Sequence, residues 1–163
     1  MSRRVEKLLK AYPEMVQKRD CLAYQLAHFK GVSAEEVIAS MMTPKADGER
    51  VQSSSLSDKT AQIAMTYRDR QDQINREWYE QLEKQWHLLN DEVVFLESAI
   101  ESLPDRLSAF MRDLVIEHLT WDTLESKYHI SRFTVSSYRK KGIQELETRF
   151  AERDREMITF MLG

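Results

Sequence analysis

The sequence predicts an all-α protein in which a long, coiled-coil-like central helix follows N-terminal helices and precedes a C-terminal helix-turn-helix domain. The 163 residues include only 4 Gly and 3 Pro, so long stretches contain no helix-breaking residue. Apolar residues recur at spacings of three and four over most of the chain, which is the period of one helix face. Charged residues make up 31% and hydrophobic residues 42%, a balance that excludes collagen-like, low-complexity and disulfide-scaffold classes.

The N-terminal part is expected to form two helices. Pro13 suits the first turn of a helix, where its missing N–H does no harm, and the apolar positions that follow continue to Gly31. A second, short helix is expected from Ser33, because Ser33 and Glu36 have the spacing of a capping box.

The middle of the chain is expected to form an exposed loop and then one long helix. Residues 43–55 contain one Pro, one Gly and three Ser, which predicts the loop. From about Leu56 to Ser102 there is no Gly and no Pro. The second half of this helix carries a coiled-coil seam made of Leu82, Trp86, Leu89, Val93, Leu96, Ile100 and Leu103.

A seam of this kind has two possible packing partners. It can lie against the N-terminal helices of the same chain, or against a second copy in a homodimer formed through the central helix. The sequence leaves both alternatives open. The predicted domains are therefore residues 1–102, which hold the N-terminal helices and the long helix, and residues 103–163.

The C-terminal domain is expected to contain two helices joined by a tight turn. Thr120 is a good N-cap for the first, short helix. His129 falls in the turn, where a left-handed backbone conformation is usually needed. Histidine tolerates this conformation better than most residues other than glycine. Ser131 is then expected to cap the second helix, with Val135 turned into the core.

The second helix carries a basic face that points to nucleic acid. Small hydroxyl side chains let a helix enter the major groove, and flanking basic side chains reach phosphates or guanine edges. Residues 131–142 contain four basic residues and no acidic residue, whereas the whole chain has a net charge of -3. The charge is thus polarised, and double-stranded DNA is the predicted partner. The predicted DNA-binding residues are Arg132, Phe133, Ser136, Ser137, Arg139, Lys140 and Lys141.

A set of positions in the C-terminal domain also carries a resemblance to a known family. These positions are Leu103-Pro104, Thr120, Leu124, Tyr128, Ile130-Ser131-Arg132, Thr134-Val135-Ser136 and Tyr138. Their pattern resembles region 4 of bacterial sigma-70-type factors, and it is similar to the helix-turn-helix of phage-encoded regulators. The serine-rich residues 51–60 before the long helix resemble a small family from phages and prophages of Gram-positive bacteria.

The resemblance implies roles for individual positions. It places Arg132, Phe133, Ser136 and Ser137 at the bases, and it places Arg139 and Lys140 near the DNA backbone. The sequence departs from the usual pattern at Glu125, where a small residue is common, and at His129, where glycine is commoner.

The function expected from residues and resemblance together is sequence-specific DNA binding in transcription regulation, by a cytoplasmic protein of phage or prophage origin. RNA polymerase is a further expected partner. Two alternatives stay open. One is a coiled-coil interaction or scaffold protein whose basic helix binds protein. The other is a sigma-like factor that binds RNA polymerase without recognising promoters by itself.

An enzyme is not expected. The four histidines are scattered without metal-ligand spacing, and no glycine-rich phosphate loop is present, so neither a metal nor a cofactor is predicted. The single cysteine, Cys21, cannot form an internal disulfide, which favours the reducing cytoplasm. The start of the chain lacks a signal-peptide core, and no run of about 18 apolar residues occurs, so no membrane association is expected.

Overall fold

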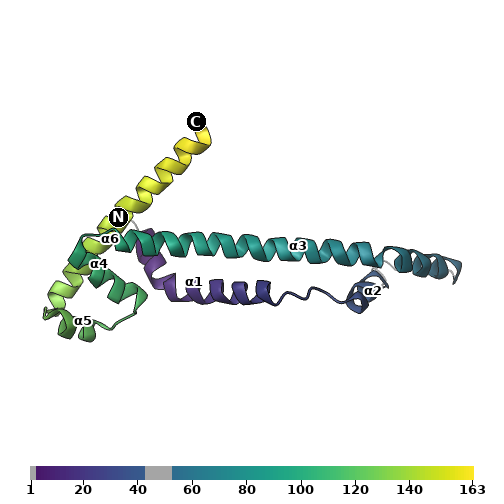
Figure 1. Cartoon of the computed structure of the whole chain (residues 1–163), viewed down its shortest axis with the longest axis horizontal. Helices are drawn as coiled ribbons and strands as arrows, with labels where there is room; N and C mark the ends of the chain where they lie inside the picture. The colour runs from purple at the N-terminus through teal and green to yellow at the C-terminus, as the bar shows by residue number, and fades with distance from the viewer. Residues whose placement is uncertain (1–2, 43–52) are drawn as a thin grey trace. The chain divides into compact units, whose positions relative to one another are not determined.

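The computed structural model describes residues 3–42 and 53–163 and confirms the all-α fold. In these ranges the chain forms six α-helices and one π-helical turn, and it forms no strand there. The elements are α1 (Arg3–Ala27), α2 (Ala34–Met42), α3 (Ser53–Glu101), α4 (Asp105–Met111), the π-helical turn η1 (Arg112–Ile116), α5 (Trp121–Tyr128) and α6 (Arg132–Leu162) (Figure 1).

The chain divides into two compact units. Unit 1 comprises Met1–Asp20 and Leu88–Gly163, and unit 2 comprises Cys21–His87. This division differs from the expected boundary after residue 102. The start of α1 and the end of α3 share one hydrophobic core with the C-terminal helices, so they belong to the same unit as α4, α5 and α6.

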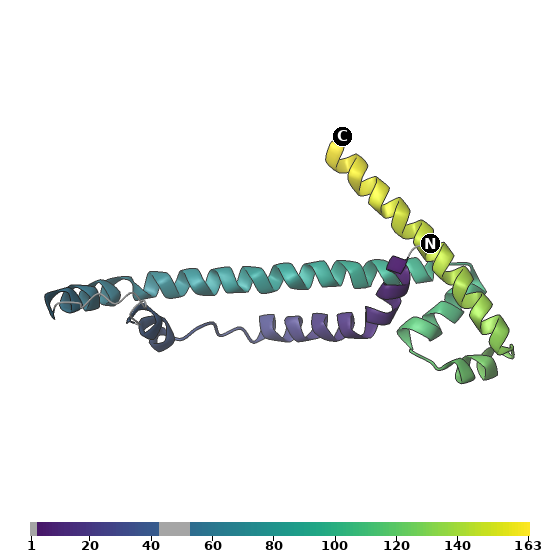
Figure 2. The ribbon, with the colours of Figure 1, turned by 180° about the vertical axis from the view of Figure 1, so that it is seen from behind.

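Helix α1 begins earlier than expected, and Pro13 lies inside it. The expectation that Pro13 occupies a first turn is therefore wrong. Val5 and Tyr12 are 1% and 5% exposed, so burial in the core holds the preceding turns helical. Proline lacks the N–H for one intrahelical bond and crowds the preceding turn. The ribbon accordingly changes direction within α1 in both views (Figures 1 and 2).

In unit 2, the predicted capping box at the start of α2 is confirmed. The backbone N–H of Glu36 donates to Ser33 Oγ at 3.2 Å, and the N–H of Ser33 donates to Glu36 Oε2 at 3.1 Å. Two otherwise unpaired donors are thereby satisfied. Val37, one position further, is the buried residue of this helix.

The segment before α2 is fixed to α3 within unit 2. Asn75 Oδ1 accepts a hydrogen bond from the Val32 N–H at 2.8 Å, and Gln71 Nε2 donates to the Val32 carbonyl at 3.1 Å. The ring of Phe29 meets Trp78 and Tyr79 edge-on, each at 5.3 Å between centroids. Edge-to-face pairs at such distances stabilise by roughly 0.5–1.5 kcal/mol each, so both polar and aromatic contacts hold this segment.

The predicted loop lies mostly outside the described residues. Residues 43–52 are among those the structure does not describe, and 53–55 already belong to α3. The long helix thus starts three residues before the expected Leu56 and ends at Glu101, one residue before the expected Ser102.

The C-terminal half of the seam is buried inside the chain itself. Val93, Leu96, Ile100 and Leu103 are at most 4% exposed, and all four belong to the core of unit 1. The Tyr12 hydroxyl donates to Glu97 Oε1 at 2.6 Å, which ties α1 to the same stretch of α3. In unit 1 the seam therefore packs on the chain's own helices, and a homodimer through the central helix stays a prediction.

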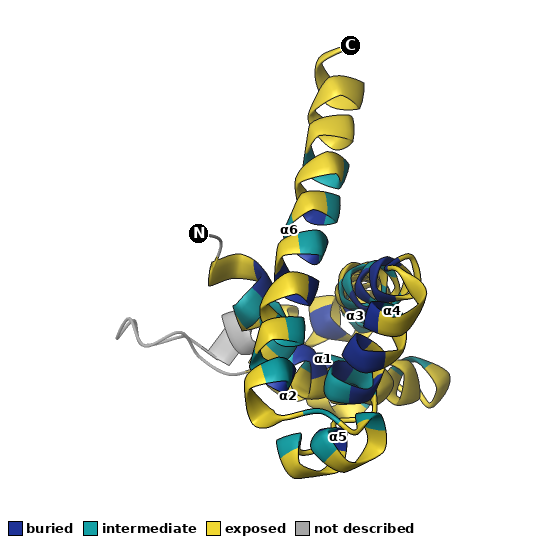
Figure 3. Ribbon diagram, turned by 90° about the vertical axis from the view of Figure 1, so that its left-hand side faces the viewer, coloured by how far each residue is buried: buried dark blue, intermediate teal, exposed yellow. Residues whose placement is uncertain are grey.

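The core of unit 1 lies between α1, the end of α3 and the C-terminal helices. Its largest fully buried side chains include Phe110, Met111, Leu124 and Leu146. Phe110 meets the rings of Tyr128 and Tyr138 edge-on, at 5.7 and 5.4 Å. Figure 3 shows that buried residues follow the inner face of α6 over its first half, whereas its last turns are exposed.

Helix α6 extends well beyond the basic residues 131–142. It runs for 31 residues without interruption, so the basic segment and the C-terminal tail belong to one helix. Gly142 does not end it. This residue is buried, and the side chain of Met111 from α4 fills the space where a Cβ would stand.

Candidate nucleic-acid interface

The α5–turn–α6 segment has the local geometry that the sequence predicts. Thr120 Oγ1 accepts from the Thr123 N–H at 3.2 Å at the start of α5, and Ser131 Oγ accepts from the Thr134 N–H at 3.2 Å at the start of α6. Between them, His129 is left-handed with φ 53° and ψ 48°. The two N-caps and the left-handed turn are therefore confirmed.

The turn is closed by backbone hydrogen bonds and by the core. The N–H groups of His129 and Ile130 both point to the carbonyl of Glu125, Ile130 at 3.2 Å. Glu125 itself is half-buried, so the packing accommodates its side chain where a small residue is commoner. Leu124 and Val135 are both 0% exposed, which fixes the two helices against each other through the core.

A buried carboxylate that no motif in the sequence indicates supports the α5–turn–α6 segment. Asp113 is 7% exposed and accepts hydrogen bonds from the Tyr128 hydroxyl at 2.6 Å and from Lys127 Nζ at 2.7 Å. Burial alone would raise the pKa of Asp113, but these bonds and the nearby positive charges outweigh burial and lower it. Burial and the bond to the carboxylate raise the pKa of Tyr128. Asp113 thus remains ionised and anchors the end of α5.

A π-helical turn explains why Asp113 faces inward. The apolar residues from Leu107 to Leu119 recur at helical spacing, but the chain becomes π-helical at Arg112–Ile116 and His118 is left-handed with φ 55°. A π-turn adds one residue to a helical turn and so shifts the face that later residues present. No signal in the spacing of the apolar residues indicates this shift.

The seven predicted site residues all lie on α6, and the structure brings them onto its outer surface. Phe133, Ser136, Ser137 and Lys140 are spaced so that they follow one face of a helix. Ser136 and Arg139 are half-buried, and the other five are exposed. The buried residues of α6 include Val135, Gly142, Ile143, Leu146 and Phe150, which form its inward face.

Arg132 is oriented by α5. Its guanidinium carbon lies 5.3 Å from the centroid of the Trp121 ring, and its Nη1 is 3.2 Å from Asp122 Oδ1. Both charged side chains are more than 60% exposed, at 64% and 85%, so the ion pair itself adds at most about 1 kcal/mol to stability. The contact positions the arginine at the start of both helices.

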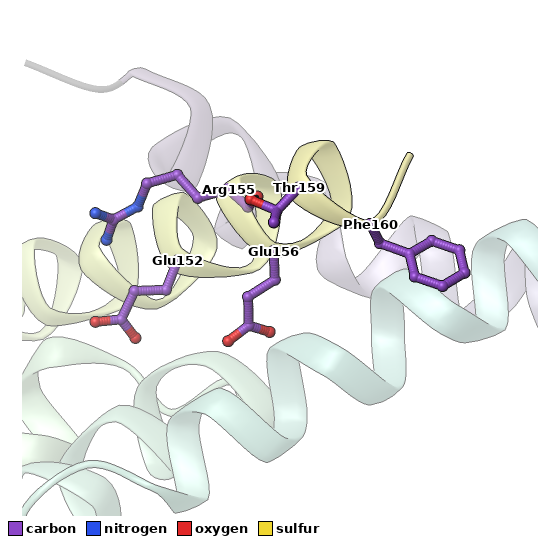
Figure 4. Close-up of a pocket in the computed structure, with 5 residues that line it drawn as sticks. All are labelled: Glu152, Arg155, Glu156, Thr159 and Phe160. Carbon is purple, nitrogen blue, oxygen red and sulfur yellow. The ribbon is translucent and has the colours of Figure 1, made fainter. Parts of the chain in front are cut away.

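The far end of α6 offers a different surface. Figure 4 shows a shallow hollow whose five labelled residues all belong to this one helix. Glu152 and Glu156 point to the same side, whereas Arg155 extends away from them (Figure 4). Mixed charges on a single helix do not converge on a ligand, so the basic face of the first half remains the stronger candidate. The residues lining the hollow are Glu152, Arg155, Glu156, Thr159 and Phe160.

In residues 3–42 and 53–163, His, Cys and acidic side chains form no group of three or more that could hold a metal ion. None of the described helices combines the length and the apolar character that crossing a bilayer requires. Comparison of the chain with protein-family models, with curated proteins and with solved structures finds no match.

Proposed function

We propose that this protein binds double-stranded DNA sequence-specifically and regulates transcription, with α6 as the helix that enters the major groove. One observation carries the proposal. A short helix, a left-handed turn and a side-chain-capped helix present an outward face of Phe133, Ser136, Ser137 and Lys140. In helix-turn-helix proteins the second helix reads the major groove with residues near its N-terminus.

The charge distribution supports the same reading. Residues 131–142 carry four basic side chains and no acidic one, in a chain with net charge -3. Neutralising phosphates drives DNA binding, and an acidic remainder restricts contact to one face. Arg139, Lys140 and Lys141 lie about two turns beyond Arg132. We expect them to contact phosphates while the first turn of α6 contacts bases.

The finer parts of the proposal rest on the sequence resemblance to sigma region 4. They comprise a phage or prophage origin, a cytoplasmic location and RNA polymerase as a protein partner. Because the resemblance concerns the same α5–α6 segment, a polymerase contact and DNA contacts would lie close together on this unit.

The decisive experiment is selection of bound duplexes from a random DNA pool by the full chain. We expect one sequence to be enriched, with affinity that falls as salt rises. Lys140→Ala should weaken binding to all sequences and reduce the slope of log affinity against log salt by about 1. Lys84→Ala, an exposed lysine on α3 in unit 2, is the matched control and should leave the slope unchanged. Failure to enrich any duplex would refute the proposal.

A second candidate function is protein interaction, and a specific observation favours it. Five apolar side chains at the end of α6 are each 54–88% exposed, and contiguous apolar surface of this kind marks interaction sites. Sedimentation of the full chain, with and without DNA, distinguishes the two functions. Association of the chain in the absence of DNA would support protein interaction, whereas a monomer that sediments faster only with DNA would support DNA binding by a monomer. The five residues are Met157, Ile158, Phe160, Met161 and Leu162.

A further inference from the structure

The exposed aromatic ring of Phe133 is the unexplained feature of the basic face. Phe133 is 83% exposed, whereas Val135, two residues further along the same helix, is fully buried. The chain has six phenylalanines, and four of them pack against other aromatic rings. These four are Phe29, Phe95, Phe110 and Phe150.

The neighbours of Phe133 do not shelter the ring. Arg132 is drawn towards α5 by Trp121 and Asp122. Ser137, one turn along the same face, is small and exposed. In the part of the chain that the structure describes, the Phe133 side chain makes no ring contact. An apolar group is therefore presented to whatever covers this face.

DNA offers one apolar group at the floor of the major groove, which is the C5-methyl group of thymine. Polar base edges would leave the ring without a matching surface, and phosphates attract the basic residues instead. The first turn of the second helix is also the part that comes nearest to the bases in this docking geometry.

We propose that Phe133 is a specificity-determining residue that reads thymine, by packing its ring against the 5-methyl group in the major groove. This inference rests on the proposed DNA-binding function and adds the chemistry of one recognised base. Ser136 and Ser137 leave room for the helix to approach, so that the ring reaches the methyl group.

The test replaces thymine by deoxyuridine, which removes only the methyl group. After selection of a bound duplex, each thymine is exchanged singly, and affinity is measured by fluorescence anisotropy. For the wild type, we expect one position at which the exchange weakens binding about four-fold, as for the loss of one buried methyl group. Phe133→Ala should bind the two duplexes equally.

The matched control is Met65→Ala, which removes an equally exposed apolar side chain, also 83% exposed, from α3 in unit 2. It should keep the four-fold preference for thymine. Thermal unfolding of Phe133→Ala should match the wild type, because an exposed ring contributes little to the core.

The outcomes separate this inference from the function on which it rests. If a duplex is enriched but no single exchange weakens binding, the thymine assignment is wrong and DNA binding stands. The same holds if Phe133→Ala retains the preference for thymine. If no duplex is enriched, DNA binding itself is wrong, and the thymine assignment with it.

Discussion

At the scale of single residues, Asp113 shows how a buried charge holds the end of α5 in place. Its carboxylate is held by Tyr128 and Lys127, both at the end of α5. Removing the charge leaves the tyrosine hydroxyl and the lysine without their ionised acceptor. A buried donor that loses its hydrogen-bond partner destabilises the folded state more than an exposed donor does, because water cannot replace the missing partner. Asp113 therefore connects the π-helical turn to the turn that precedes α6.

We predict that Asp113→Asn lowers the free energy of unfolding by about 1–3 kcal/mol at neutral pH, measured by urea titration. Asp122→Asn is the matched control. Asp122 is 85% exposed in its pair with Arg132, so its loss should cost less than about 1 kcal/mol. Equal effects of the two substitutions would contradict the anchoring role.

The pH dependence follows from the direction of the Asp113 pKa shift. Its pKa is lower in the folded state than the ordinary value of 3.8, so the stabilisation is fully present above the unfolded pKa. It is lost as pH falls through the lower, folded pKa. We therefore expect the gap in unfolding free energy between wild type and Asp113→Asn to shrink as pH is lowered below about 4. A gap that stays constant down to acid pH would contradict this assignment.

Arg132 carries the residue-scale prediction for DNA binding. Arg132→Ala should weaken binding to the selected duplex by about 1–3 kcal/mol and relax its sequence preference, because an arginine near base edges reads sequence as well as charge. Lys140→Ala should instead weaken binding to selected and scrambled duplexes alike. Anisotropy titrations on both duplexes distinguish the two patterns. A double variant that binds as the wild type does would overturn the assignment of α6.

At the scale of elements, α6 continues through Gly142 because α4 packs over it. An exposed helical glycine is destabilising by roughly 0.5–1 kcal/mol relative to alanine, so Gly→Ala normally stabilises a helix. Here an added methyl group would overlap the side chain of Met111, which is 0% exposed, so that side chain would have to shift within the packed core. Overpacking of this kind costs about 1–3 kcal/mol, which exceeds the gain in helix propensity.

We therefore predict that Gly142→Ala lowers the free energy of unfolding in the wild-type background. In a Met111→Ala background, where the obstruction is gone, the same substitution should stabilise by up to about 1 kcal/mol. Thermal or urea unfolding of the four variants of this cycle measures the change of sign. The prediction is wrong if Gly142→Ala has the same effect in both backgrounds.

At the scale of the whole molecule, unit 1 is assembled from two distant parts of the chain. Val5 is 1% exposed and belongs to the same core as Phe110, Leu124 and Leu146. Arg149 of α6 also donates from Nη2 to the Ser102 carbonyl at 3.1 Å, just beyond the end of α3. The candidate DNA-binding helices therefore depend on residues more than a hundred positions earlier in the chain.

We predict that Val5→Ala destabilises the unit that contains α5 and α6 by about 0.5–3 kcal/mol, by leaving a cavity in the shared core. Of the three tryptophans, only Trp121 lies in unit 1. Its fluorescence in a Trp78→Phe, Trp86→Phe background therefore reports the unfolding of unit 1. Lys7→Ala, an exposed residue of α1, is the control. If Val5→Ala left the unfolding transition of Trp121 unchanged, the assignment of Val5 to a core shared with α5 and α6 would be wrong.

The sequence predicts well the features that neighbouring residues decide. The caps at Ser33, Thr120 and Ser131 each depend on a side chain that reaches a backbone group three residues away. The left-handed turn at His129 and the helical period of the seam are equally local. These features form in the same way wherever the segment is placed.

Features that depend on distant partners were not predictable in this way. Pro13 lies inside α1 because burial of Val5 and Tyr12 outweighs its local preference for a first turn. Gly142 stays helical because Met111 covers it, and Asp113 is buried because a π-helical turn faces it towards Lys127 and Tyr128. The sequence by itself determined the all-α class, the caps and the basic face of α6. The tertiary structure decided which helices share a core, because burial energy depends on contacts between residues far apart in the chain.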